Sequence, residues 1–269
     1  MATRRNNLRF SRTPWLGRSL FLAILALSLL APMNFVLITP GEPTALFPKT
    51  LTLKGATTYP TDGQLYLLTI MVTNPETKVL GAEILGCWVW GECAVMPRSV
   101  MYEDGTTNKE EEKSGTESME DSQSEALLAS LKEIKKLFPD NRVDLIDPDA
   151  ISVKLKNTGG PSGGLIFAIG ITEMLTQQDI LKGRKIAGTG TITSDGVVGP
   201  IGGVAEKILG AQKAGASLLF ISQENCGELP EKIEGIKVIA VQTLHEAIGY
   251  LLLTPQKSPS SPVIGCQNL

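Results

Sequence analysis

The stretch Thr158-Gly159-Gly160-Pro161-Ser162-Gly163-Gly164 places a serine on a glycine-rich turn, and the apolar run Leu165–Leu175 follows it directly. Glycines permit a tight turn and the close approach of another backbone segment. The apolar run predicts a helix whose first backbone N–H groups point back toward the turn. Ser162 is therefore a candidate nucleophile, and those N–H groups are candidate donors to the oxyanion of an acyl transfer.

A serine nucleophile needs a base, and the sequence favours a lysine. The one histidine of the chain, His245, lies near the C-terminal end in no recognisable motif. Lys207 ends the stretch Gly199-Pro200-Ile201-Gly202-Gly203-Val204-Ala205-Glu206-Lys207. A lysine accepts a proton only when it is neutral, so its pKa must fall from about 10.4, which requires burial. Glu206 need not pair with Lys207, because adjacent residues of a helix do not face each other.

The composition describes one globular domain with extra segments. The chain has 269 residues, of which 42% are hydrophobic, and a formal net charge of −3. This balance gives no basic surface for nucleic acid, so no nucleic-acid partner is expected. The four cysteines form no CxxC pair, and no histidine cluster suggests zinc, so we expect neither a metal nor a cofactor. Cys87 and Cys93 are predicted either to close a small disulfide loop or to remain buried thiols.

The N-terminal part has the pattern of a membrane segment. Residues 1–18 contain five arginines and no acid, and residues 19–39 are almost wholly apolar. As a helix, Leu20–Ile38 would span about the thickness of a bilayer core. The pattern predicts a basic cytoplasmic tail (1–18), a transmembrane signal anchor (19–39) and a catalytic part outside the cytoplasm. A cleaved signal peptide is the alternative, but no small-residue cleavage site follows the apolar run.

The middle of the chain divides by composition. Residues 40–102 predict an N-terminal strand region, with strands at Thr50–Leu53 and Leu65–Val72, while Lys78–Trp90 fits a helix or a strand. Residues 103–121 are acidic and polar, which predicts a flexible surface segment.

Residues 122–253 are expected to form the catalytic domain, and residues 254–269 a flexible tail rich in proline and serine. Ser122, with Glu125 three residues later, predicts a helix N-cap. The predicted helices are Gln123–Phe138, Leu165–Leu175, Val204–Ala214 and Thr243–Leu253. The predicted strands are Ala150–Leu155, Lys185–Ile192, Leu218–Ile221 and Val238–Val241, with a turn at Ser194-Asp195-Gly196 before Val197-Val198. This mixture indicates a layered α+β or α/β domain, and we expect the α+β class.

Four motifs together resemble the proteolytic domain of Lon proteases in type, order and spacing. They are Pro161-Ser162-Gly163-Gly164, Gly188-Thr189-Gly190-Thr191-Ile192, Gly196-Val197-Val198-Gly199-Pro200-Ile201-Gly202-Gly203 and Glu206-Lys207. The resemblance covers about Ala150–Tyr250. It implies that fold and a serine–lysine dyad, with Ser162 as the nucleophile and Lys207 as the base. It also implies supporting roles for Gly160, Pro161, Gly163 and Thr189, whose hydroxyl would bond the lysine amine.

The whole chain resembles the membrane-anchored Lon-like proteases of bacteria more than Lon itself. The chain has no Walker A motif, which implies cleavage without ATP. Phe138–Ala150 is too short for the PDZ module of many anchored relatives. Gly163 stands where the family usually has alanine, and Gly160 where Lon has aspartate. Because Lon proteolytic domains assemble as rings, the resemblance also implies a possible homo-oligomer.

The expected function is therefore an ATP-independent serine endopeptidase that acts on polypeptides. We expect it at the cell membrane, as a single-pass protein with an extracytoplasmic catalytic domain. One rival is a catalytically silent Lon-like binding or scaffold domain. The other is a GHMP-type small-molecule kinase, whose Gly/Ser-rich loop normally carries more serines than this one.

Overall fold

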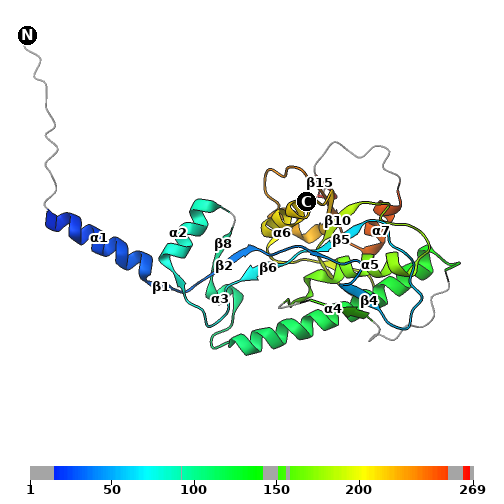
Figure 1. The fold of residues 1–269 in the computed structure, drawn as a ribbon, viewed down its shortest axis with the longest axis horizontal. Coiled ribbons are helices and arrows are strands. Elements are labelled where there is room, and N and C mark those ends of the chain that lie inside the picture. Colours follow the sequence, from blue (N-terminus) through cyan, green and yellow to red (C-terminus); the bar gives the residue numbers. More distant parts are fainter. Residues whose placement is uncertain (1–14, 92, 142–150, 156–157, 254–262, 267–269) are drawn as a thin grey trace, which may run out of the picture.

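The computed structural model describes residues 15–91, 93–141, 151–155, 158–253 and 263–266. A six-stranded sheet forms its centre, with α6 (Val204–Lys213) on one side of β5 and β10 and α5 (Gly164–Leu175) on the other (Figure 1). In spatial order the strands are β15 (Val263–Ile264), β14 (Lys237–Val241), β13 (Leu218–Ser222), β10 (Lys185–Gly188), β5 (Gln64–Leu67) and β3 (Thr44–Ala45). The strands from β15 to β5 pair in parallel, and β3 pairs antiparallel with β5. The architecture is thus mixed α/β and differs from the expected α+β class in its largely parallel sheet.

Both faces of this sheet are buried, because successive side chains of each strand enter different cores. On β10, Ile186 belongs to one core and Ala187 to the other; on β13, Phe220 and Ile221 divide in the same way. Parallel sheets covered on both faces are encoded by continuous apolar runs rather than alternating ones. This explains why the apolar runs near residues 218 and 238 correctly predicted β13 and β14.

Helices make the outer layers. They are α1 (Trp15–Leu30), α2 (Gly81–Trp90), α3 (Arg98–Met101), α4 (Asn108–Leu137), α5 (Gly164–Leu175), α6 (Val204–Lys213) and α7 (Leu244–Leu252), with the 3₁₀ turns η2 (Pro161–Gly163) and η3 (Gln223–Glu228). α5 is buried along nearly all its length and contacts α4, α7 and the sheet. α7 begins as expected, because the Thr243 side chain accepts a hydrogen bond from the backbone N–H of Glu246.

Smaller sheets complete the fold. They are β6 (Ile70–Val72) with β2 (Phe35–Pro40) and β8 (Ala94–Pro97), β1 (Pro32–Met33) with β7 (Val79–Leu80), β4 (Leu51–Leu53) with β9 (Ile151–Val153), and β11 (Thr191–Ile192) with β12 (Val198–Gly199). Two predicted strands are each divided in two: residues 65–72 into β5 and β6, and residues 185–192 into β10 and β11. The ambiguous stretch 78–90 forms β7 and then α2.

The prediction of one helix across residues 19–39 was wrong in extent. The helix is α1, which ends at Leu30, and residues 35–40 form β2 between β6 and β8. Pro32 opposes continuation of the helix, and the branched side chains of Val36 and Ile38 are buried in β2. Within the part of the chain that the structure describes, no helix has both the length and the apolar composition needed to cross a bilayer.

The predicted flexible segment 103–121 was also wrong from residue 108 onward, because α4 runs unbroken from Asn108 to Leu137. Its N-cap is Thr107, whose side chain accepts from the N–H of Glu110 while the Glu110 carboxylate accepts from the N–H of Thr107. Ser122, the predicted N-cap, is a buried residue inside this helix. The reciprocal Thr-x-x-Glu pair is a helix-start signal that overrides the polar composition.

The two disulfides were not both foreseen. Cys87 is bonded to Cys93, which decides between the two alternatives for that pair, and Cys226 is bonded to Cys266. The second disulfide joins η3 to Cys266, two residues after the end of β15. β15 itself extends the central sheet beside β14. The prediction of a flexible tail is therefore wrong for residues 263–266, and its other parts lie outside the described residues.

A buried carboxyl in α5 should make stability depend on pH. Glu173 is 2% exposed, and its burial raises the pKa to about 7 despite the hydrogen bond from the Ile180 N–H. Because the folded pKa lies above the unfolded one, its contribution is complete below about pH 4.5 and is lost as the pH rises through about 7. We expect this loss to lower the free energy of unfolding by roughly 1–3 kcal/mol.

Urea unfolding across this pH range would measure the effect in Glu173→Gln. Glutamine keeps an oxygen that can accept from Ile180 but does not titrate. This variant should lose the pH-dependent component, whereas the exposed control Glu120→Gln should retain it. An unchanged pH dependence in Glu173→Gln would contradict the assignment.

Candidate active site

The candidate nucleophile lies on a short 3₁₀ turn that leads directly into α5. Gly160 precedes the turn with φ 91° and ψ 160°, a backbone region that is essentially restricted to glycine. Pro161 opens the turn and Ser162 follows, partly exposed, while Gly163 is buried. An aspartate at position 160, as in Lon, would be strained in this conformation, so the glycine belongs to this particular turn.

α4 forms the wall that holds the turn. The Gly160 N–H donates to the Gly115 carbonyl at 2.7 Å, and the Ser122 hydroxyl donates to the Pro161 carbonyl at 3.0 Å. The backbones are so close that a Cβ at Gly159 would lie 2.8 Å from the carbonyl carbon of Gly115. Gly115, in the stretch predicted to be a flexible surface segment, therefore helps to position the serine.

Thr189 and Gly190, just beyond β10, hold the other side of the turn. The Thr189 hydroxyl donates to the Ser162 carbonyl at 3.1 Å, and the Gly190 N–H donates to the same oxygen at 2.9 Å. The structure therefore brings Thr189 to Ser162. Its hydroxyl hydrogen, however, bonds the Ser162 backbone rather than the Lys207 amine, so its observed contact positions the turn.

Two backbone N–H groups next to the turn already donate hydrogen bonds within the protein. The Gly164 N–H donates to the Pro161 carbonyl, and the Leu165 N–H donates to the Gly190 carbonyl at 3.1 Å. These first helical N–H groups are therefore not the oxyanion donors that the sequence suggested. The N–H groups of Ser162 and Gly163, earlier on the turn, are the next candidates.

Lys207 lies in α6 and is buried, with 2% of its surface exposed. Burial lowers its pKa to about 8, and the charge of Glu206 opposes that shift. The lysine is thus partly neutral near neutral pH, as a general base requires. Glu206 is itself buried, and its charge acts on Lys207, but among the described residues no salt bridge joins the two side chains, as expected for neighbours on a helix.

The face of α6 that carries Lys207 points toward the strands beside Ser162. Gly203, Lys207 and Gly210 follow each other at helical spacing and share one face. A Cβ at Gly203 would lie 2.8 Å from Ile70, and one at Gly210 would lie 3.6 Å from Leu68. Both contacted residues line a cavity together with Ser162. Among the described residues, however, no hydrogen bond joins the Ser162 hydroxyl directly to the Lys207 amine.

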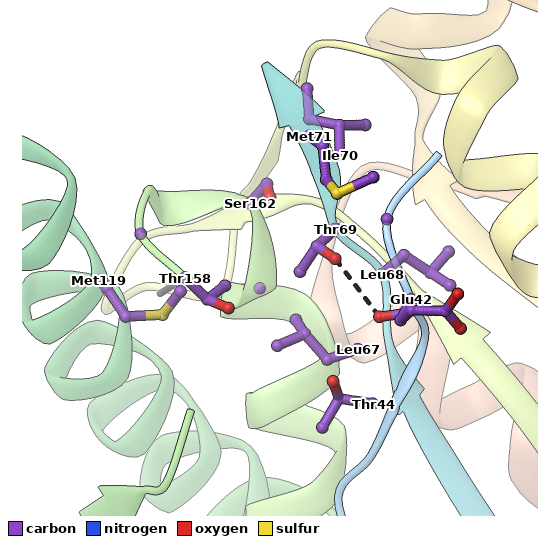
Figure 2. Close-up of a pocket in the computed structure, with 13 residues that line it drawn as sticks. Glu42, Thr44, Leu67, Leu68, Thr69, Ile70, Met71, Met119, Thr158 and Ser162 are labelled. Atoms are coloured by element: carbon purple, nitrogen blue, oxygen red, sulfur yellow. Dashed lines mark hydrogen bonds between the residues drawn. The ribbon is translucent and has the colours of Figure 1, made fainter. Parts of the chain in front are cut away.

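This cavity has a volume of about 370 Å³ and lies between α4 and the β5–β6 segment. Figure 2 shows Ser162 close to Ile70 and Met71, with Met119 and Thr158 on one side and Glu42 and Thr69 on the other. The Thr69 hydroxyl donates to the Glu42 carbonyl at 3.4 Å, and the Glu42 carboxylate pairs with Lys213. The apolar lining comes from Leu67, Leu68, Ile70, Met71 and Met119.

Gly163 is a glycine because its surroundings leave no room for a side chain. A Cβ there would lie 2.8 Å from Leu67 and 2.8 Å from the ring of Phe167. Leu67 and Phe167 thus occupy the space of the alanine that the family usually has.

Gly163→Ala is expected to destabilise the fold by about 1–3 kcal/mol and to lower peptidase activity, because Ser162 must move with its neighbour. Urea unfolding and a cleavage assay would measure both effects. Gly227→Ala is the matched control, since a Cβ there meets nothing within 4 Å. Adding Phe167→Leu to Gly163→Ala should recover part of the loss. A normal unfolding midpoint in Gly163→Ala alone would contradict the packing argument.

His245, the one histidine, lies in a different cavity. Its Nδ1 is 2.6 Å from the Glu133 carboxylate, so the pair connects α7 to α4. The residues around this second cavity include Lys132, Asp195 and Thr243 but not Ser162. The structure therefore gives His245 a contact between helices rather than a place beside the nucleophile.

Comparison with known proteins agrees with these motifs. Residues 117–254 match the family model of the Lon protease (S16) C-terminal proteolytic domain. Lon protease 2 of Bacillus subtilis is 38% identical over 96 residues, which cover 36% of this chain and 17% of the relative. Lon protease of Clostridium beijerinckii is 33% identical over 132 residues, which cover 46% of this chain and 16% of the relative. The matches thus span less than a fifth of these relatives.

Proposed function

Because the chain belongs to the Lon protease (S16) C-terminal proteolytic domain family, we propose that it is a serine endopeptidase with Ser162 as its nucleophile and Lys207 as its general base. The observation that carries the proposal is the burial of Lys207, which lowers its pKa to about 8 on the helix face directed at the cavity of Ser162. A solvated lysine would stay protonated at neutral pH and would be useless as a base.

In the proposed mechanism, neutral Lys207 takes the proton of the Ser162 hydroxyl, and the serine oxygen attacks the scissile carbonyl carbon. Backbone N–H groups at Ser162 and Gly163 stabilise the oxyanion. Lys207 then gives the proton to the leaving amine, which departs and leaves an acyl-enzyme. Water hydrolyses the ester and regenerates the serine. The bond between Thr189 and the Ser162 carbonyl supports this role by fixing the nucleophile.

The proposed substrates are unfolded polypeptides with an apolar side chain next to the scissile bond. Leu67, Met119 and Ile70 supply the apolar part of the cavity lining near Ser162. The chain has no Walker A motif, which supports cleavage without ATP by this chain. Substrate selection without a PDZ module and assembly into a ring of identical subunits remain part of the proposal.

We further propose that the catalytic part lies on the extracytoplasmic side of the membrane and is attached through the N-terminal segment. The arginines of residues 1–18 support this orientation. Two disulfides give independent support, because disulfides persist in oxidising compartments and are rare in the cytosol. External protease added to spheroplasts should degrade the catalytic part without lysis. Protection until lysis would contradict the proposed location.

Two assays of the full chain test the activity. The first is cleavage of casein without ATP, and the second is labelling by a fluorophosphonate probe, which reacts with activated serines. Cleavage and labelling together support the proposal. If the chain shows neither cleavage nor labelling but binds a nucleotide tightly, the small-molecule kinase is favoured. If the chain shows neither cleavage nor labelling but still binds polypeptides, a silent binding domain is favoured.

A further inference from the structure

α2 is an apolar helix, and the described part of the chain leaves most of its surface exposed to solvent. Its ten residues include one charged side chain, Glu83, and Cys87 is its one buried residue. The exposed surface of the helix is formed by Leu85, Trp88, Val89 and Trp90, which we call the α2 face. The two tryptophans are 80% and 79% exposed. A helix with this composition is ordinarily buried in a core or a membrane.

The start of α2 lies against the C-terminal end of α1. The N–H of Gly81, the first residue of α2, donates to the Ala31 carbonyl at 3.3 Å, just after α1 ends. A Cβ at Gly81 would lie 2.1 Å from the Ser28 carbonyl oxygen, so the two backbones touch. None of the α1 residues is buried either. In Figure 1 both helices lie at the end of the molecule opposite α5 and α7.

The charges near this end favour a lipid surface over another apolar partner. The Glu83 carboxylate accepts from the Leu80 N–H at 2.7 Å and so belongs to the start of the helix. Exposed Lys78 ahead of β7 is cationic, which suits anionic headgroups. Tryptophan prefers the membrane–water interface, where its ring is apolar and its N–H can still find a partner.

We propose that α2 lies in the headgroup region of a membrane, with Trp88 and Trp90 at the boundary between headgroups and acyl chains. A helix of this length spans about 15 Å and is too short to cross, so it would lie along the surface. The cystine Cys87–Cys93 closes the chain around the end of the helix and keeps the two tryptophans beside β8. The inference rests on the membrane attachment contained in the proposed function, and it adds a second contact that orients the catalytic part.

The chain has three tryptophans, Trp15 in α1 and the pair in α2, so fluorescence can report on each helix separately. In the full chain, Trp15→Phe leaves the α2 pair, and the double variant Trp88→Phe/Trp90→Phe leaves Trp15. Each variant is reconstituted in vesicles of phosphatidylcholine and phosphatidylglycerol. The acyl chains carry bromine, a fluorescence quencher, either near the headgroup or deep in the bilayer. Far-UV circular dichroism checks that both variants are folded.

The expected result is quenching of Trp88 and Trp90, stronger with bromine near the headgroup than deep in the bilayer, together with loss of quenching by aqueous iodide. Quenching of Trp15 without quenching of the α2 pair would overturn the inference while leaving the attachment intact. Vesicles that retain no protein would refute both. A different result would be shielding of the α2 pair from iodide without lipid, to a degree that increases with protein concentration. This result would show that a second copy covers the α2 face, and it would overturn the inference.

Discussion

Ser162→Ala should lower kcat/KM for an unfolded protein by roughly 10³- to 10⁶-fold, the range seen when a nucleophile is removed from an acyl-transfer site. Alanine has no oxygen to form the acyl-enzyme, so any remaining activity must come from water that the site orients. The fold should be unaffected, since the bonds that hold the turn involve the Ser162 carbonyl and its neighbours rather than the hydroxyl.

The measurement is cleavage of labelled casein by the full chain, beside urea unfolding of the same samples. Ser124→Ala is the matched control, because Ser124 is partly exposed on α4 and its hydroxyl donates to the Glu120 carbonyl of its own helix. Wild-type activity and stability are expected there. Cleavage by Ser162→Ala at a rate close to that of the parent would remove Ser162 from the mechanism, whatever the fluorophosphonate probe labels.

Lys207 should control the pH dependence of the same reaction. Its lowered pKa of about 8 means that the charged form dominates below that pH and the neutral form above it. Since the base must be neutral, kcat/KM should rise about tenfold per pH unit on the acid side and level off above about pH 8. Lys207→Arg should lose activity by at least about 10²- to 10⁴-fold at every pH, because guanidinium does not deprotonate.

A second variant separates the loss of a base from a packing defect. Lys207→Ala opens a space in which a small primary amine, added to the buffer, could restore part of the activity with a pH dependence set by its own pKa. Lys185→Arg on the exposed side of β10 is the control and should keep the parent profile. A pH profile of the parent that stays flat through about pH 8 would contradict the assignment of Lys207 as the base.

The sequence predicted those parts of the fold that local patterns encode. Apolar runs predicted α5, β13 and β14, because an element buried on all sides has few polar residues. Thr243 predicted the start of α7 through its capping group. At the candidate site, the motifs led to Ser162, Thr189 and Lys207, and the structure brings Thr189 to Ser162.

Other features depended on contacts between residues far apart in the chain. Nothing near Gly163 in the sequence reveals that Leu67 fills the space beside it. Predicting the hydrogen bond from Gly160 to Gly115 would have required knowing that α4 begins at Asn108. The polar composition of residues 108–121 concealed that helix start. The division of residues 19–39 between α1 and β2 could not be predicted, because a uniformly apolar run fits a helix and a buried strand equally well.

The outermost strand of the central sheet has a consequence for the proposed cleavage of unfolded chains. The edge of a sheet offers unpaired backbone groups to any extended polypeptide, a second strand of substrate included. On the β14 side that place is taken by β15 from the same chain, and the bond between Cys266 and Cys226 keeps it there. β15 thereby occupies the edge of β14 with which an extended chain could otherwise pair.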